Sequence, residues 1–130
     1  MAVPSVATYS VAALEDAHTT FRDLIDAGTG AGKIFIRDSA DVLLAEIPLV
    51  DPCGTVSGVT GQLTFAISGP DTSADATGTA AYAEIADSDN NVHLSIPAQA
   101  GTVAVSGYIV MNTLSVIAAS PVSIVSAVIG

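Results

Sequence analysis

Hydrophobic residues near the N-terminus recur at steps of three and four, which predicts one amphipathic helix over residues 11–27. Ser10 is a suitable N-cap because its hydroxyl oxygen can accept a hydrogen bond from the first turn, and Gly28 stands where a left-handed C-cap is expected. Arg22 and Asp26 are four residues apart and are expected to pair on the solvent side. The apolar stripe of this helix consists of Leu14, Ala17, Phe21, Leu24 and Ile25.

From residue 33 onward the hydrophobic period changes to two, which is typical of strands that are buried on one face. Ile34 and Ile36 alternate with Lys33, Phe35 and Arg37 in this way. The expected strands cover residues 33–37, 42–47, 62–67, 79–86, 92–96, 102–111, 113–118 and 122–128.

Loops are expected where Gly, Pro, Asp and Asn gather between the apolar runs. The second strand is expected to end at Pro48, and an irregular loop to follow over residues 50–61. Residues 68–78 form the most polar loop, and residues 87–91 (DSDNN) predict a tight hairpin turn.

One helix followed by about eight strands predicts a mainly β fold. Parallel strands need long crossover connections, and no second helix separates the strands, so the pairing should be mainly antiparallel. An antiparallel β-sandwich and a jelly-roll-like barrel both suit this strand count. The length of 130 residues suits a single domain over residues 10–130, preceded by an N-terminal arm over residues 1–9.

The charge balance excludes one class of partner. Three basic residues stand against thirteen acidic ones, and the net charge is -10. Such a field repels phosphate groups, and the three cations, Arg22, Lys33 and Arg37, are too few to line a groove. We therefore expect no nucleic-acid partner.

No residue after Asp89 carries a formal charge, and only 12% of the whole chain is charged. Soluble domains ordinarily have about a quarter of their residues charged. Either Ser and Thr cover this region or part of it is buried against neighbouring chains, and we expect the second. The run from Val103 to Ile129 is long enough to span a membrane, but polar residues interrupt it at strand-like intervals and no cation flanks it. We expect no membrane span.

Two short motifs resemble binding sites without completing them. GTGAGK at residues 28–33 follows a helix and is followed by Ile34, where a phosphate loop needs Ser or Thr, so we interpret it as a helix-to-strand turn. Asp87, Asp89 and Asn91 match the opening of a calcium loop, but the positions for the required Gly and the closing Glu hold other residues. Turn chemistry explains these residues, with a weak cation site as the alternative.

The two histidines and the single cysteine are the remaining candidates for catalysis. His18 lies at the edge of the helical stripe and His93 on the strand face opposite the apolar one, so both are expected to be solvated or interface imidazoles. Cys53, between Pro52 and Gly54, is expected in a turn that can expose it, without a cationic neighbour to lower its pKa. The sequence contains no Ser nucleophile elbow. We predict no enzyme activity, no catalytic residue, no cofactor and no metal site.

The stretch DLIDAGTGAGKIFIRDS, residues 23–39, resembles a family of small structural proteins encoded in the head and tail modules of tailed bacteriophages. The resemblance continues at Leu43–Ala45 (LLA), at residues 72–91 (TSADATGTAAYAEIADSDNN) and at Gly101–Val103. It is spread over most of residues 10–110, in the same order along the chain.

The resemblance implies a virion protein without catalytic residues, assembled in the cytoplasm of the bacterial host. Two roles are open: a capsid decoration (cement) protein that binds the major capsid protein shell and stabilises it, or a neck, tail or baseplate component. An uncharged flank rich in Ala, Val and Ser suits symmetric self-contact, which favours decoration. We expect copies to associate as trimers or dimers through residues 103–129, and residues 1–9 to lie extended on a neighbour. The acidic loops over residues 68–78 and 87–91 are expected to face solvent or basic patches.

Overall fold

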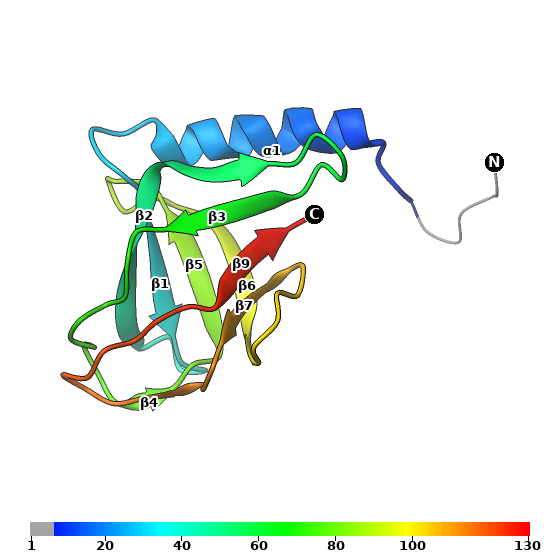
Figure 1. The fold of residues 1–130 in the computed structure, drawn as a ribbon. Coiled ribbons are helices and arrows are strands. Elements are labelled where there is room, and N and C mark those ends of the chain that lie inside the picture. The colour runs from blue at the N-terminus through cyan, green and yellow to red at the C-terminus, as the bar shows by residue number, and fades with distance from the viewer. Residues whose placement is uncertain (1–6) are drawn as a thin grey trace.

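The computed structural model describes residues 7–130, which form a closed seven-stranded barrel, a small two-stranded sheet and one N-terminal helix (Figure 1). The predicted mainly β fold is therefore confirmed, in its barrel form. Most of the predicted N-terminal arm lies outside the described residues. The elements are α1 (Val11–Asp26), β1 (Lys33–Arg37), β2 (Leu43–Val56), β3 (Leu63–Ile67), β4 (Gly78–Thr79), β5 (Tyr82–Ala86), β6 (Val92–Ala100), β7 (Tyr108–Met111), β8 (Ser115–Val116) and β9 (Ser126–Ile129).

The barrel has the strand order β1-β2-β3-β9-β7-β6-β5, and β5 closes it by pairing with β1. Neighbouring strands of the barrel are antiparallel except for β6 and β7, where Ala98–Ala100 run parallel to Ile109–Met111. A parallel pair of three residues spans only about 10 Å, so a short loop can carry the chain back without a helix. The small sheet pairs β4 with β8 beside the barrel.

Strand β2 is longer than the sequence predicts, and the expected loop over residues 50–61 is wrong for its first half. The strand changes partner, from β1 up to Pro48 to β3 from Leu49 onward. Pro52 falls where the pairing with β3 is irregular, between Leu49 and Gly54, so its missing N–H costs no ladder hydrogen bond. The strand therefore runs through both prolines.

Strand β6 extends to Ala100, beyond the expected end at residue 96, whereas the strands that follow it are shorter than predicted. The expected strand over residues 102–111 is confined to β7, because residues 101–107 fold back as a loop. Between β8 and β9, Val122 forms an isolated bridge with Asp71, which joins the C-terminal segment to the polar loop over residues 68–78. The expected strand over residues 79–86 is divided into β4 and β5.

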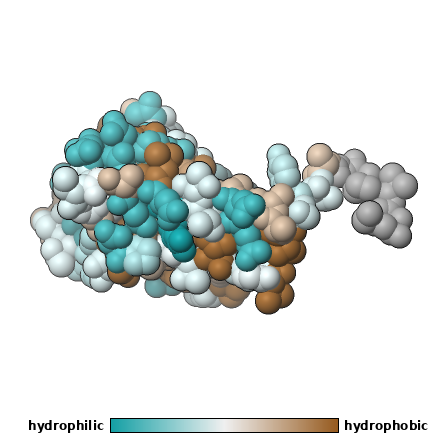
Figure 2. All heavy atoms as spheres, turned by 90° about the horizontal axis from the view of Figure 1, so that it is seen from above, coloured by the Kyte–Doolittle hydropathy of each residue, from teal (hydrophilic) through white to brown (hydrophobic). Residues whose placement is uncertain are grey.

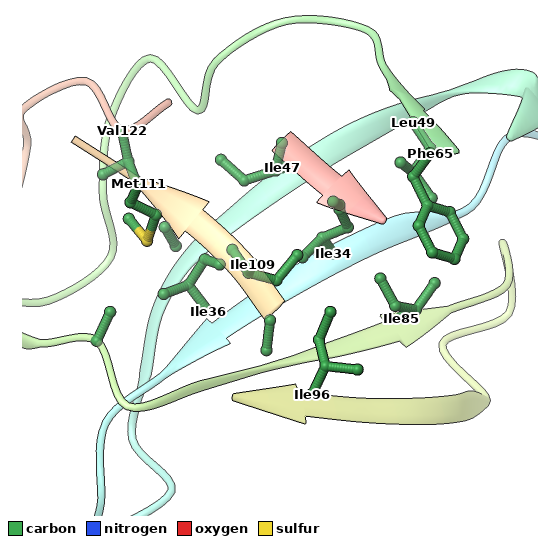
Figure 3. Packing of buried hydrophobic residues seen from close by; sticks show 14 of the residues in the cluster. Ile34, Ile36, Ile47, Leu49, Phe65, Ile85, Ile96, Ile109, Met111 and Val122 are labelled. Carbon is green, nitrogen blue, oxygen red and sulfur yellow. The ribbon is translucent and has the colours of Figure 1, made fainter. Parts of the chain in front are cut away.

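Branched aliphatic side chains fill the barrel interior. Ile34 and Ile36 from β1 converge with Ile47, Ile85 and Ile109 from three other strands, and all of them are buried (Figure 3). The inward alternation predicted for β1 is confirmed. Small and β-branched residues pack well on such pleated, curved surfaces, which is why few aromatics are needed.

Helix α1 lies across one end of the barrel, over β2 and β3 (Figure 1). Ile25 is buried in the core, and the rings of Phe21 and Phe65 meet edge to face at 6.3 Å. Leu24 is 46% exposed and Ala17 is exposed, so the buried stripe is narrower than predicted. The reason is that the helix rests on two strands and leaves its remaining surface to solvent.

The predicted N-cap is confirmed, because the Ser10 hydroxyl accepts a hydrogen bond from the Ala13 N–H at 3.2 Å. The predicted left-handed C-cap at Gly28 is wrong. Ala27 is the C-cap, with right-handed helical backbone angles. Gly28 instead lies close to Ser88, whose hydroxyl group would have to move to make room for a Cβ atom there.

Candidate functional site

The phosphate-loop look-alike is a packed turn between α1 and β1, as predicted. A Cβ atom at Gly32 would lie 2.5 Å from the Ile25 side chain and 2.6 Å from the Ala86 carbonyl oxygen. Glycine is therefore needed here so that the helix end can approach β5, and the turn holds the helix against the barrel.

Cys53 is buried in β2, so its expected place in an exposed turn is wrong. Its N–H donates to the Asp26 carboxylate at 2.9 Å, which fastens the end of α1 to β2. The predicted Arg22–Asp26 pair is also wrong, because Arg22 pairs with Asp23 at 3.4 Å. Burial, reinforced by the nearby Asp26 carboxylate, raises the pKa of the Cys53 thiol to about 12. Burial also raises the pKa of Asp26.

We predict that the Cys53 thiol reacts with an aromatic disulfide reagent at least about 100-fold more slowly in the folded protein than after denaturation, since the thiolate is the reactive form. The rates can be followed by absorbance at pH 8. A Cys53→Ala/Val59→Cys variant is the matched control, because Val59 is 84% exposed and a thiol there should react rapidly. Equal rates for folded and denatured wild type would contradict the prediction.

The predicted turn at residues 87–91 is confirmed, and Asp87 organises it. One carboxylate oxygen accepts the N–H groups of Asp89 at 2.9 Å and Asn91 at 3.0 Å. The other lies 3.0 Å from Nε2 of His93. His93 therefore contacts Asp87 while its side chain remains partly exposed, and it stabilises the hairpin. Within residues 7–130, no group of three or more His, Cys, Asp or Glu side chains is arranged to hold a metal ion.

His18 lies at the edge of the helical stripe, as predicted, and its imidazole also makes a contact within the protein. Its Nδ1 atom lies within hydrogen-bond distance of the Gly61 carbonyl oxygen. This contact joins α1 to the turn between β2 and β3. The two histidines make separate contacts, and within residues 7–130 neither forms a hydrogen bond with Cys53.

The Asp87 contacts predict a pH dependence of stability. The hydrogen bond from His93, together with those from Asn91 and Asp89, lowers the pKa of Asp87 from 3.8 to about 2. Because the folded-state pKa is the lower one, this contribution to stability is present above about pH 4 and is lost as the pH falls to about 2. We expect the free energy of unfolding to decrease over that interval, and to decrease less in Asp87→Asn.

Urea unfolding at pH 5, 3 and 2 measures this difference. Asp89→Asn is the matched control, because Asp89 is an exposed acid in the same turn. An Asp87→Asn variant whose stability changes with pH as much as that of the wild type would contradict the prediction.

The uncharged C-terminal region has two parts in the structure. One part supplies the core of the barrel itself, which explains much of its apolar character without a second chain. The members of this core are Ile109, Met111, Val116, Val122 and Ala127, whereas Val110 and Val128 are buried outside it. The other part is exposed, with Val103 at 72%, Ile117 at 59% and Val125 at 39%. Association of copies through the exposed part stays a prediction.

Charge divides the barrel into two sides. Strands β3, β9, β7 and β6 are consecutive neighbours, and their sequences contain no Asp, Glu, Lys or Arg. We call these four strands, together with the loop over residues 101–107, the uncharged wall. The other three strands carry Lys33, Arg37, Glu46, Asp51 and Glu84. Seen from the helix end, hydrophobic patches are interspersed with hydrophilic residues (Figure 2).

The loop over residues 101–107 packs against the outside of the uncharged wall. The Gly107 N–H donates to the Val128 carbonyl oxygen at 2.7 Å. Val110 is buried although it alternates with the inward-facing Ile109 and Met111, and a Cβ atom at Gly101 would lie 3.5 Å from it. This loop therefore lies close to Val110 at its Gly101 end, and it presents the exposed side chain of Val103.

The charged side of the barrel pairs its cations internally. Lys33 lies 3.2 Å from Glu46, and Arg37 pairs with Glu84 while its guanidinium lies 5.8 Å from the centre of the Phe35 ring. These half-exposed pairs contribute little to stability. With the few cations occupied, the remaining carboxylates make this side and the helix acidic.

A hollow of about 450 Å³ lies between this charged side and the polar loop over residues 68–78. Its lining includes Lys33, Glu46, Asp71 and Asp75. The Asp71 carboxylate is already used within the protein, because it accepts the N–H groups of Glu46 and Ser73, each at 2.9 Å. The hollow is therefore an acidic surface feature, and one of its carboxylates, that of Asp71, holds the loop by accepting backbone hydrogen bonds.

Comparison of this chain with protein-family models, curated proteins and solved structures finds no match. Within residues 7–130, no helix has the length and apolar character needed to cross a membrane. The resemblance to phage head and tail proteins thus remains an expectation from the sequence.

Sequence reasoning located only part of the uncharged wall. It pointed to residues 103–129, whereas the wall also includes β3 and β6, which precede that region. The lack of charge in residues 61–70 is visible in the sequence. That this stretch lies beside β9 follows only from the strand order, which the sequence pattern does not reveal.

Proposed function

We propose that this chain is a non-enzymatic structural protein of a tailed-bacteriophage virion. In this proposal it binds the major capsid protein shell as a decoration (cement) protein and stabilises the shell. The observation that carries the proposal is the division of the barrel into an uncharged wall and an acidic remainder, which suits a protein that functions by surface contact. The family resemblance of residues 23–39 and 72–91 supplies the virion context.

The rigidity of the fold supports a structural role. Within residues 7–130, the seven strands of the barrel pair in a closed ring, so the barrel has no free edge strand to which a strand of another chain could add. The Cys53 N–H donates to the Asp26 carboxylate, and the Gly61 carbonyl oxygen accepts from His18, and both contacts fasten the helix over the barrel end. A small domain of this kind can be displayed in many copies without polymerising through its strands.

Binding to a shell would depend on many modest contacts. Each contact needs about 1,000 Å² or more of buried surface to be specific. Once one copy is held, its neighbours on a regular shell bind at high effective concentration. The acidic helix and turns are available to basic side chains of the shell, while the uncharged wall is available to neighbouring copies.

A neck, tail or baseplate position is the second candidate, because the family resemblance extends to the tail modules of these phages. The two roles differ in copy number. A decoration protein would be present in numbers comparable to the major capsid protein, whereas a neck or tail component would form one or a few rings. Quantitative mass spectrometry of purified particles separates the two roles.

A shell-binding experiment tests the proposal. Particles of the phage or prophage that encodes this chain are prepared from a deletion mutant and mixed with purified protein, and bound protein is measured by co-sedimentation. We expect saturable binding to the heads and greater resistance of those particles to heat or chelator. Failure to co-sediment, together with absence from wild-type particles, would refute the proposal.

A further inference from the structure

We infer that the uncharged wall is the surface through which two copies of this chain associate. This inference deepens the proposed function by naming the self-contact, and it rests on that function only for its biological purpose. The wall consists of β3, β9, β7, β6 and the loop over residues 101–107, as defined above.

The charge distribution favours a second copy as the occupant. Each chain carries a net charge of -10, so two copies repel each other wherever acidic surfaces meet. Repulsion between exposed charges falls off over about 8 Å at physiological salt. Two copies that face each other through their uncharged walls keep the acidic helix and the charged strands apart, on the outer sides of the pair.

The chemistry of the wall also suits self-association. Its exposed side chains are neutral, so a contact removes no unpaired charge from water and avoids the main cost of burying ionic groups. The exposed members include Thr64 on β3, Ser95, Pro97 and Gln99 on β6, and Val103 on the covering loop. Val103 is 72% exposed, and an apolar side chain so open to water gains from contact with another neutral surface.

A partner with strong charge of either sign would find no complementary group on this wall. A basic partner would be attracted to the acidic side of the barrel, and an acidic partner would be repelled by the chain as a whole. Association of two walls should therefore become tighter as salt screens the repulsion between the acidic copies. An interface made of ion pairs would become weaker under the same change.

Sedimentation equilibrium of the purified chain tests the inference, at about 50 mM and about 500 mM salt. We expect a reversible dimer in the wild type, and we expect its association to tighten with salt. Val103→Asp should weaken association at least about 10-fold. Val42→Asp is the matched control, because Val42 is 46% exposed and directly precedes the charged strand β2, so this substitution should leave association unchanged.

Circular dichroism and thermal unfolding of both variants establish that they are folded. A wild type that stays monomeric at every concentration would overturn the inference, as would association that weakens with salt or equal effects of the two substitutions. Shell binding is measured separately. A wild type that dimerises without binding shells would refute the proposed function and leave the inference standing. A wild type that binds shells as a monomer would support the proposed function and overturn the inference.

Discussion

Replacing Ile34 with alanine is expected to lower the free energy of unfolding by about 2 to 5 kcal/mol, which is a large part of the stability of a small domain. Ile34 is fully buried at the centre of the barrel, where side chains from several strands converge (Figure 3). The substitution removes apolar contacts and leaves a cavity that closed strands cannot fill by moving inward, since each strand is hydrogen-bonded on both sides.

The exposed isoleucine Ile117 provides a matched control for the same chemical change, because its side chain is 59% exposed. Ile117→Ala is expected to change the free energy of unfolding by no more than about 0.5 kcal/mol. Urea denaturation at neutral pH measures both variants. Similar losses for the two substitutions, or a loss below about 1 kcal/mol for Ile34→Ala, would show that the barrel interior is not packed as described.

Gly54→Ala is expected to destabilise the protein by at least about 2 kcal/mol, although it adds a single methyl group. A Cβ atom at Gly54 would lie 2.5 Å from the Thr64 carbonyl oxygen and 2.9 Å from the Leu63 side chain. Both neighbours belong to β3, whose backbone is held by β2 on one side and by β9 on the other. Relief of the clash therefore requires a shift of the sheet itself.

Gly69→Ala tests whether this effect comes from close approach or from the flexibility of glycine in general. No atom lies within 4 Å of a Cβ built at Gly69, and its backbone is not in the left-handed region. We expect the stability of the Gly69→Ala protein to be unchanged or slightly increased, because alanine restricts the conformations of the unfolded chain. A Gly54→Ala protein as stable as Gly69→Ala would contradict the strand packing at the β2–β3 irregularity.

The elements with a clear hydrophobic period could be predicted from the sequence. The helix, the strand with Ile34 and Ile36, and the hairpin around Asp87 each follow from side-chain spacing or turn chemistry that is local. Strand β2 could not be predicted in full. Its prolines ordinarily end a strand, but Pro48 lies where the strand changes partner and Pro52 lies in the irregular part of the pairing with β3.

The candidate site depends on contacts that are distant in the sequence. Cys53 stands between a proline and a glycine, a pattern typical of exposed turns, yet the Asp26 carboxylate and the end of α1 cover it. The uncharged wall likewise brings β3 beside β9, and nothing in the local pattern of either strand indicates its neighbour. The composition predicts that an uncharged surface exists, and the order of the strands in the barrel determines where that surface lies.

The division of charge also accounts for how one small barrel could serve as a structural unit. The three cations, Arg22, Lys33 and Arg37, pair with carboxylates of the same chain. In the proposed role, contacts with other molecules would use the acidic helix and turns on one side and the neutral wall on the other. The two surfaces can be altered separately, so shell binding and self-contact can be measured apart.

The most direct test of the proposed role is a cryo-electron microscopy comparison of wild-type particles with particles from a deletion mutant of this gene. We predict barrel-shaped density on the outer surface of the head, repeated with the symmetry of the shell and missing from the mutant. Identical head maps for the two particles, with any difference confined to the neck or tail or with none at all, would contradict the decoration role.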